Sequence, residues 1–372
     1  MSSANIPNTY RAGQFTQPGG QLEIREVQMP QLRENEVLIK VESCVLGSCD
    51  ELWRNDLLPH LRFPATPGLA VVGEIVKMHQ GGNRGSMGGR KLKEGMMVVA
   101  LTWNGGLAQY ATADEHCVTE VRSGQFKGEE TGLPVIAFDG GRVYSSIQRC
   151  ERECKALDEA EKRALRQVNE RVGYREDECA LVIYGEGGFA RLAIDTAKAY
   201  VDKMQHGMLP HMSNRHKVNI VLVAPSNRWS AKDYGLREEQ VICLDRDQGN
   251  IEQRLKQYGG AQLTICADQP NKGLEQVLDG SRWGSTVVLL EPNREGNLQI
   301  PLANILVKNI RVAGPPLLTH ECLDHTLDFA SRHSIRAPAR HVKFEQNELN
   351  QAWREMEDGS KFDAPVVCFE RM

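Results

Sequence analysis

The sequence predicts an α/β protein that combines a β-rich domain with a doubly wound parallel sheet. Strand-like and helix-like segments alternate from residue 180 to residue 313, which is typical of a parallel sheet with helices on its faces. The first third instead consists mainly of short strand-like runs separated by proline and glycine. Strand patterns at 342–344 and 365–369 indicate that the chain returns to this β-rich domain. A chain of 372 residues is also too long for one hydrophobic core.

The segment Ala180–Tyr200 has the pattern of the first βα unit of a dinucleotide-binding domain. Gly185 permits a tight turn, Gly187 lets backbone N–H groups approach a pyrophosphate, and Ala190 is small enough for close packing of helix on strand. The helix N-terminus adds partial positive charge. The alternative is an ordinary glycine-rich turn, but strand and helix both stand in the required places. The predicted cofactor-binding residues of this turn are Gly185, Gly187, Gly188, Phe189 and Ala190.

The end of the next predicted strand, 218–224, bears on the choice of dinucleotide. A domain specific for NAD carries Asp or Glu there to accept from the ribose hydroxyls. Here the strand is followed by Pro225-Ser226-Asn227-Arg228, which contains no carboxylate. Ser226 and Arg228 can bind a 2′-phosphate, because a guanidinium pairs bidentately with phosphate oxygens. We therefore expect NADPH rather than NADH, the alternative being that Arg228 simply faces solvent.

Other patterns predict structure rather than chemistry. From Glu151 to Val172, apolar residues recur at helical spacing between charged ones, which predicts one long amphipathic helix on the surface of the main core. The segments 81–91 and 202–217 lack periodicity and are predicted as surface loops. His206, His211 and His216 in the second loop have no carboxylate or cysteine at ligand spacing, so no metal site is expected there.

Composition excludes several classes of function. The chain is 41% hydrophobic and 25% charged with a net charge of −4, which gives no electrostatic reason to bind nucleic acid or an anionic membrane. We find no apolar run of about 20 residues and no signal-peptide pattern at the N-terminus. The ten cysteines contain no CxxC pair, so reduced thiols in a cytoplasmic protein are expected.

The order of these segments resembles the medium-chain dehydrogenase/reductase superfamily, which includes zinc alcohol dehydrogenases, quinone reductases and enoyl reductases. The resemblance spans nearly the whole chain through LEIREVQMPQLRENEVLIKVESC, FPATPGLAVVGEIV, LKEGMMVVAL, GGLAQYATADEHCV, GEGGFA and FEQNELNQAWREMEDGSKFDAPVV. It implies a GroES-like catalytic domain at 1–145, completed by 320–372, and a Rossmann domain at 146–319. It also implies an active site in the cleft between them, and a homodimer formed by the edges of two nucleotide-domain sheets.

The sequence departs from the zinc-containing branch of that family. Where the resemblance places the catalytic zinc ligands, this chain has Gly47, the pair Leu69-Ala70 and, at about the last position, Phe138. None of these side chains has a donor atom for Zn²⁺, which needs thiolate, imidazole or carboxylate. The cysteine-rich lobe for structural zinc is replaced by a direct run through Thr102–Gly105. We therefore expect no zinc and no other metal.

Without a Lewis acid, oxyanion stabilisation must come from elsewhere. Zinc-free relatives mostly reduce quinones or activated C=C bonds, whose own conjugation carries the developing charge. The resemblance places Ser48 where the family often has a proton-relay group. The alternatives are an inert buried thiol for Cys49 and, for Asp50, a structural aspartate that accepts loop N–H groups. Candidate catalytic residues are Ser48, Cys49 and Asp50, with Trp103 and Asn104 as substrate-pocket candidates.

Three functions remain open from the sequence. The favoured one is an NADPH-dependent, zinc-independent oxidoreductase that transfers hydride to an activated C=C bond or a quinone in a small-molecule substrate. The second is a zinc-free carbonyl reductase or alcohol dehydrogenase, although the sequence offers no convincing Tyr-Lys pair to polarise a carbonyl. The third is a protein that binds NADPH without turnover and serves as a structural component or sensor.

Overall fold

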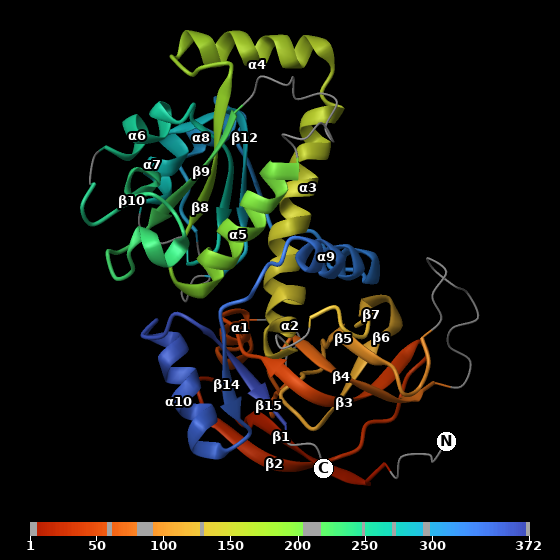
Figure 1. Cartoon of the computed structure of the whole chain (residues 1–372). Coiled ribbons are helices and arrows are strands. Elements are labelled where there is room, and N and C mark those ends of the chain that lie inside the picture. The colour runs from red at the N-terminus through yellow and green to blue at the C-terminus, as the bar shows by residue number, and fades with distance from the viewer. Residues whose placement is uncertain are drawn as a thin grey trace. The chain divides into compact units, whose positions relative to one another are not determined.

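The computed structural model describes residues 6–57, 62–79, 92–126, 130–203, 217–247, 250–269, 273–292 and 298–369. The chain divides into two compact units, Met1–Gly141 with Leu318–Met372, and Arg142–Leu317 (Figure 1). The predicted loop 81–91 and all three histidines of the predicted loop 202–217 lie outside the described residues. Among the described residues, no helix combines the length and the apolar character needed to cross a bilayer.

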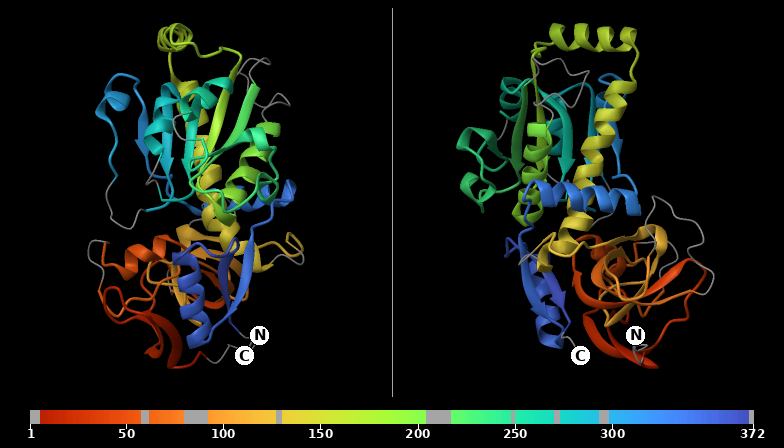
Figure 2. Two further views of the ribbon diagram at one scale, coloured as in Figure 1. Left: turned by 90° about the vertical axis from the view of Figure 1, so that its left-hand side faces the viewer. Right: turned by 45° about the vertical axis from the view of Figure 1, so that its right-hand side comes forward.

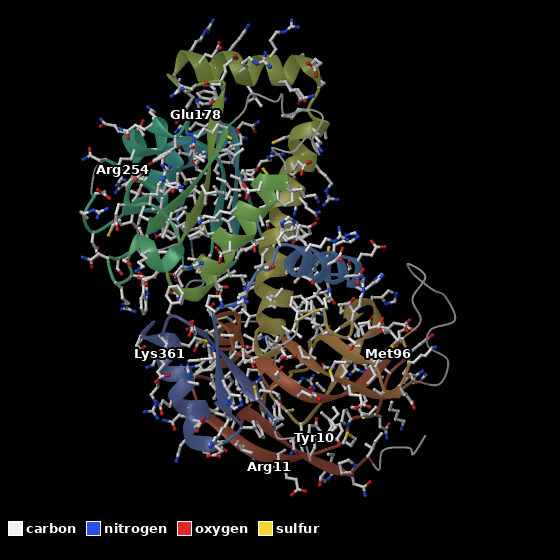
Figure 3. All side chains as sticks on the ribbon, viewed as in Figure 1. Tyr10, Arg11, Met96, Glu178, Arg254 and Lys361 are labelled. Atoms are coloured by element: carbon white, nitrogen blue, oxygen red, sulfur yellow. The ribbon has the colours of Figure 1, made fainter. Side chains whose placement is uncertain are left out.

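The first unit is built mainly of strands. Its largest sheet has the order β14-β15-β3-β4-β5-β7, with β6 also paired to β3, and β1 and β2 form a separate antiparallel pair. Tyr10, labelled in Figure 3, lies on β1. Its ring contacts that of Tyr110 at a centroid distance of 5.8 Å. The strands are β1 (Thr9–Phe15), β2 (Leu22–Gln28), β3 (Glu36–Val45), β4 (Ala70–Met78), β5 (Met97–Leu101), β6 (Tyr110–Asp114), β7 (Val118–Glu120), β14 (Ala339–Lys343) and β15 (Ala364–Cys368).

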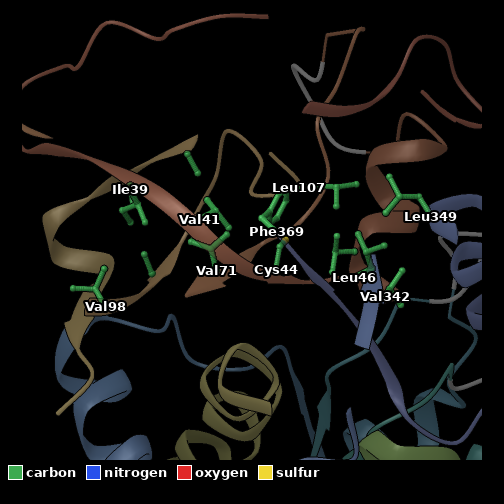
Figure 4. Packing of buried hydrophobic residues seen from close by; sticks show 14 of the residues in the cluster. Ile39, Val41, Cys44, Leu46, Val71, Val98, Leu107, Val342, Leu349 and Phe369 are labelled. Carbon is green, nitrogen blue, oxygen red and sulfur yellow. The ribbon is translucent and has the colours of Figure 1, made fainter. Parts of the chain in front are cut away.

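Few helices accompany these strands. They are α1 (Cys49–Arg54), α2 (Leu133–Val135), α9 (His320–Arg332) and α10 (Gln346–Glu357). The core of this unit joins apolar residues of the N-terminal strands with residues of the C-terminal segment, such as Val342, Leu349 and Phe369 (Figure 4). Burial of these late residues against Val41 and Leu46 explains why the chain must return to complete the β-rich unit.

The second unit is a parallel sheet of order β10-β9-β8-β11-β12-β13. Its strands are β8 (Glu178–Tyr184), β9 (Lys217–Ala224), β10 (Val241–Cys243), β11 (Ala261–Cys266), β12 (Ser281–Leu289) and β13 (Arg311–Ala313). Its helices are α3 (Gly141–Ala156), α4 (Glu159–Arg171), α5 (Gly187–Lys203), α6 (Ile251–Gln257), α7 (Leu274–Asp279) and α8 (Leu302–Leu306). Strand order reverses between β8 and β11, so the predicted doubly wound α/β architecture is confirmed.

Helices cover both faces of this sheet (Figure 2). Ile251 and Leu255 of α6 and Val277 of α7 pack in one cluster with Val182 of β8 and Val221 of β9. Because β8 and β9 are buried along nearly their whole length, they lack the alternation of a half-exposed strand. Arg254 of α6, labelled in Figure 3, pairs with Asp247 at 2.7 Å and ties the helix to the segment after β10.

The prediction of one helix over 151–172 is wrong. The helix α3 ends at Ala156, and α4 begins at Glu159. The Asp158 carboxylate accepts from the Glu161 N–H at 2.8 Å, and the Glu161 carboxylate accepts from the Asp158 N–H at 2.9 Å. This reciprocal pair is a capping box, which starts a new helix even though the apolar periodicity continues through it.

Candidate functional site

The glycine-rich turn lies where the carboxyl end of β8 meets α5. Gly185 has a φ of +148°, and a Cβ atom there would lie 3.1 Å from the Ala267 carbonyl carbon and 3.0 Å from the Asp268 Cβ. Gly187 has a φ of +74°, which favours glycine as well. Ala190 is fully buried, as the close packing of helix on strand requires. The turn therefore has the backbone that the motif predicts.

Two N–H groups of this turn are held by side chains. The Tyr234 hydroxyl, in the short helix η5 (Ala231–Tyr234), accepts the Gly187 N–H at 3.0 Å. The Asp268 carboxylate, just beyond β11, accepts the Glu186 N–H. Gly188 and Phe189 belong to the first turn of α5, whose amides have no acceptor within the helix. Their N–H groups are therefore the ones that can bind an anion such as a pyrophosphate.

The predicted 2′-phosphate residues lie on the loop after β9. The Ser226 hydroxyl donates to Glu186 Oε2 at 2.6 Å, and Ser226 Oγ accepts the Arg228 N–H at 3.2 Å. Ser226 is half-buried and Arg228 is exposed. Glu186, the second residue of the glycine-rich turn, thus places a carboxylate beside the residues that suggested NADPH.

Asp268 lies at the point where strand order reverses. The pKa of its carboxyl is raised to about 6: burial is the main cause and the nearby Glu186 carboxylate contributes, while hydrogen bonds from the backbone N–H groups of Gln269 and Glu186 act in the opposite direction. Arg228 also lowers it. In an open α/β sheet, ligands bind outside the carboxyl ends of the strands at such a switch point. Asp268 is therefore a titratable group placed at the expected ligand site.

A buried ion pair stands at the carboxyl end of β12. Arg142 Nη2 lies 2.8 Å from Glu291 Oε1, and both side chains are almost fully buried. The Arg142 guanidinium also lies over the Phe189 ring at 5.1 Å from its centroid and donates to the Leu290 carbonyl. Arg142 thereby joins three segments at the same edge of the sheet: the first turn of α3, the glycine-rich turn and the end of β12.

In the first unit, Asp50 joins two loops. Its Oδ2 accepts the Gly47 N–H at 3.0 Å and its Oδ1 accepts the Gly68 N–H at 2.7 Å. Asp50 is 2% exposed. Ser48 and Cys49, the other two candidate catalytic residues, are half-buried at the start of α1 beside this junction. The structure thus brings the three candidates together, with the Asp50 carboxylate bonded to backbone.

The two pocket candidates lie on the loop after β5. Trp103 is 58% exposed, and its side chain bonds to the Cys117 thiol. Asn104 Nδ2 donates to Thr112 Oγ1 at 3.3 Å. The loop is tied to the Asp50 junction through Thr102, whose hydroxyl donates to the Gly68 carbonyl at 2.7 Å. The side chains of Trp103 and Asn104 therefore form hydrogen bonds with residues of the segment 112–117. The backbone next to them is linked through Thr102 to the Gly68 loop, which Asp50 also binds.

The positions where the resemblance places zinc ligands carry no side chain that can bind a metal ion. The Asp50 carboxylate beside these positions accepts the N–H groups of Gly47 and of Gly68, the residue before Leu69. Within the described ranges, no group of three or more His, Cys, Asp or Glu side chains is arranged to hold a metal ion. The residues present do not fit a zinc ion at this place.

Sequence reasoning missed five residues at the carboxyl edge of the parallel sheet: Glu186, Tyr234, Asp268, Arg142 and Glu291. Asp268 and Glu291 each follow directly on a predicted strand, 263–267 and 286–290. A carboxylate just past the end of a parallel strand was a usable signal, because ligands bind at that edge. Tyr234 and Arg142 gave no such signal, since their partners are distant in the sequence.

Comparison with known proteins supports an assignment to a family. Residues 33–123 match the alcohol dehydrogenase GroES-like domain. The chain is 27% identical to an alcohol dehydrogenase of Geobacillus stearothermophilus, over 93% of this chain and 95% of that protein. It is 24% identical to alcohol dehydrogenase 2 of Caenorhabditis elegans, over 99% of both chains. An acryloyl-coenzyme A reductase of Metallosphaera sedula is 29% identical over 48% of this chain and 52% of its own length.

Solved structures have the same fold. An alcohol dehydrogenase from Aeropyrum pernix superposes with a TM-score of 0.72 at 14% identity, covering 96% of this chain and all of that one. A Helicobacter pylori protein, described as CAD complexed with NADP(H), superposes with a TM-score of 0.69 at 12% identity, covering 98% and 99%. At this low identity the likeness shows the fold alone.

Proposed function

We propose that this chain is an oxidoreductase of the medium-chain dehydrogenase/reductase superfamily and that it transfers hydride from NADPH to an activated C=C bond or a quinone without zinc. The observation that carries the proposal is the glycine-rich turn at the N-terminus of α5. There the Gly188 and Phe189 amides are available to an anion, while Tyr234 and Asp268 hold the neighbouring ones.

Zinc independence is argued from the donor set. Gly47, Leu69 and Phe138 stand where the family holds its metal, and none carries a donor atom. A plain carbonyl then lacks its usual Lewis acid. An enone, an enoyl thioester or a quinone accommodates the charge by its own conjugation, which favours such acceptors. The acryloyl-coenzyme A reductase among the relatives, which by its name acts on an enoyl thioester, is in line with this class.

The chain's own residues have separable tasks in this proposal. Bound NADPH supplies the hydride. The amides at the start of α5 bind the pyrophosphate, and Ser226 with Arg228 contacts the 2′-phosphate. The Ser48 hydroxyl and the Cys49 thiol are the candidates to deliver a proton to the reduced substrate. Asp50 acts indirectly, because its carboxylate fixes the backbone at Gly47, directly before Ser48, and holds it to the loop at Gly68.

Reduction of a carbonyl, or oxidation of an alcohol, is the second candidate. Two relatives matched over 93% and 99% of this chain are named alcohol dehydrogenases, which favours this chemistry. The chain would then need hydrogen-bond donors in place of the metal to stabilise the oxyanion. Among the predicted catalytic residues, Ser48 carries the hydroxyl that could serve as such a donor.

We also propose a homodimer in the cytoplasm. The strand β13 is the edge of the parallel sheet, and α8 precedes it. Leu302 and Leu306 of α8, and Val307, are 71%, 77% and 58% exposed. Large apolar side chains concentrated beside an unpaired strand edge favour burial by a second copy.

The test is a titration of chelator-treated protein with NADPH and NADH, followed by turnover with a quinone, an enone, an aldehyde and a ketone. Tight NADPH binding and NADPH oxidation by the quinone or enone, unaffected by chelator, support the proposal. Turnover with only the aldehyde or ketone supports the second candidate. Binding without turnover of any acceptor contradicts both and leaves a nucleotide-binding protein.

A further inference from the structure

The end of β9 lacks an acid, but the glycine-rich turn supplies one. The strand finishes at Ala224, and the loop after it runs Pro225-Ser226-Asn227-Arg228. Glu186 extends from the turn after β8, the strand paired directly with β9, and its Oε2 accepts from the Ser226 hydroxyl at 2.6 Å. The Glu186 carboxylate of the glycine-rich turn therefore lies beside Ser226, in the loop where an NAD-specific domain carries its own carboxylate.

This location fits the adenosine ribose of a dinucleotide. In doubly wound sheets the pyrophosphate lies at the glycine-rich turn, and the ribose lies by the end of the second strand. Glu186 belongs to the glycine-rich turn and contacts Ser226, just after the second strand. The two ribose hydroxyls are donors, and an ionised carboxylate is an acceptor with several lone pairs. We propose that Glu186 binds these ribose hydroxyls and selects against a 2′-phosphate, so that it is a specificity-determining residue of the cofactor site.

Charge argues in the same direction. A 2′-phosphate beside Glu186 brings like charges together, and Asp268, which faces Glu186, adds a second acid. Arg228 is the cation that opposes them, and it acts on Asp268 as well. Ser226 has a single hydroxyl proton, which is committed to Glu186. A phosphate must displace that bond before Ser226 can donate to it.

Ser226 and Arg228 therefore favour a 2′-phosphate, whereas Glu186 disfavours it. The preference for NADPH that they provide is smaller than it would be beside a neutral side chain, and NADH binds better than the strand end alone suggests. This inference rests on the proposed function, since it presumes that the glycine-rich turn binds a dinucleotide.

The experiment compares the wild type with Glu186→Gln and with a control variant, Glu275→Gln. Glu275 is an exposed acid on α7, so the control makes the same change of charge away from the turn. Dissociation constants are measured for NADPH and NADH, and for adenosine 2′,5′-bisphosphate and 5′-AMP, which probe the adenosine half alone. Thermal unfolding of each variant without ligand establishes that it is folded.

In E186Q the ratio of the NADPH to the NADH affinity should rise by about tenfold or more, because a charge repulsion is exchanged for an amide donor. The ratio for the bisphosphate and 5′-AMP should rise with it, while E275Q leaves both ratios unchanged. Equal ratios in E186Q and the wild type overturn the role of Glu186 and leave the proposed function standing. If the wild type turns over no acceptor but the fragment ratio responds to E186Q, the proposed function fails and the assignment of Glu186 holds. No binding of any of the four ligands to either protein overturns both.

Discussion

Asp50 Oδ1 accepts the Gly68 N–H at 2.7 Å, while its other oxygen accepts the Gly47 N–H at 3.0 Å. The carboxylate thus joins two loops on which the family resemblance places zinc ligands, at Gly47 and at Leu69-Ala70. Gly68 has a φ of +94°, and a Cβ there would lie 2.4 Å from the Cys44 Sγ. Burial of Cys44, with the nearby Asp50 charge, holds the pKa of its thiol well above the usual range. The junction is fixed by hydrogen bonds and close packing.

Replacing Asp50 should destabilise the first unit. Asp50→Ala leaves the buried Gly68 N–H and the half-buried Gly47 N–H without this acceptor, which costs about 2–4 kcal/mol of unfolding free energy. Asp50→Asn keeps one acceptor oxygen and should cost less. Chemical denaturation measures both. If D50N instead keeps full stability and loses turnover, Asp50 acts in catalysis rather than in holding the loops.

Tyr234→Phe should loosen the glycine-rich turn. Tyr234 is fully buried, and its hydroxyl is the acceptor of the Gly187 N–H. Burial also raises the pKa of this hydroxyl, so it stays protonated at any ordinary pH. Removing the oxygen should cost about 1–3 kcal/mol and weaken dinucleotide binding.

Nucleotide titration and thermal unfolding of Y234F measure the two effects together. Tyr258→Phe is a suitable control, because the Tyr258 hydroxyl donates to the Glu239 carbonyl, away from the turn. Dinucleotide affinity equal to that of the wild type in Y234F would contradict a role for this contact in the cofactor site.

Asp268 should make stability depend on pH in a defined direction. Its pKa of about 6 in the folded chain lies above its value of about 3.9 when unfolded, so the folded state binds more protons between these values. The Asp268 contribution is therefore most favourable below pH 4 and is lost as the pH rises through 6. The shift corresponds to about 2–3 kcal/mol at most.

The measurement is the difference in unfolding free energy between the wild type and Asp268→Asn from pH 4.5 to pH 7.5. The unfolding free energy of the wild type should fall relative to that of D268N as the pH rises, because only the wild type must ionise a half-buried carboxyl. Affinity of the wild type for adenosine 2′,5′-bisphosphate should also fall over this range, more steeply than in D268N. Parallel pH profiles for the two proteins would show that Asp268 does not titrate there.

The sequence predicted the parallel sheet and the glycine-rich turn because both depend on local signals. Apolar runs of strand length, and glycines at Gly185 and Gly187, express backbone requirements that neighbouring residues satisfy. The helix boundary at Asp158 was also local but was overlooked, since the apolar periodicity hid the capping box. The sequence could not place Glu186 against Ser226, Tyr234 against Gly187, or Asp50 against Gly68. Those contacts depend on how strands pair and loops meet, which local sequence patterns do not encode.

Exposed leucines on α8 predict association. Leu306→Asp places a charge on a surface that the proposed second copy would cover, so the dimer should dissociate. Sedimentation or mass photometry at micromolar concentration measures the shift, and Leu57→Asp, at an exposed leucine of the first unit, is the control. A wild type that is already monomeric would contradict the proposed homodimer.

Breaking the Arg142–Glu291 pair should be costly. Arg142→Met leaves the Glu291 carboxylate buried without its cation, and removal of one partner of a buried ion pair typically costs about 3–5 kcal/mol. The double variant Arg142→Met/Glu291→Leu should recover most of that loss, because neither side chain then needs a counter-charge. Urea denaturation of both single variants and the double variant gives the coupling energy.

Because Arg142 also lies over Phe189, the double variant should still bind NADPH more weakly than the wild type. Additive losses without recovery would mean that the two charges are not coupled in the folded chain.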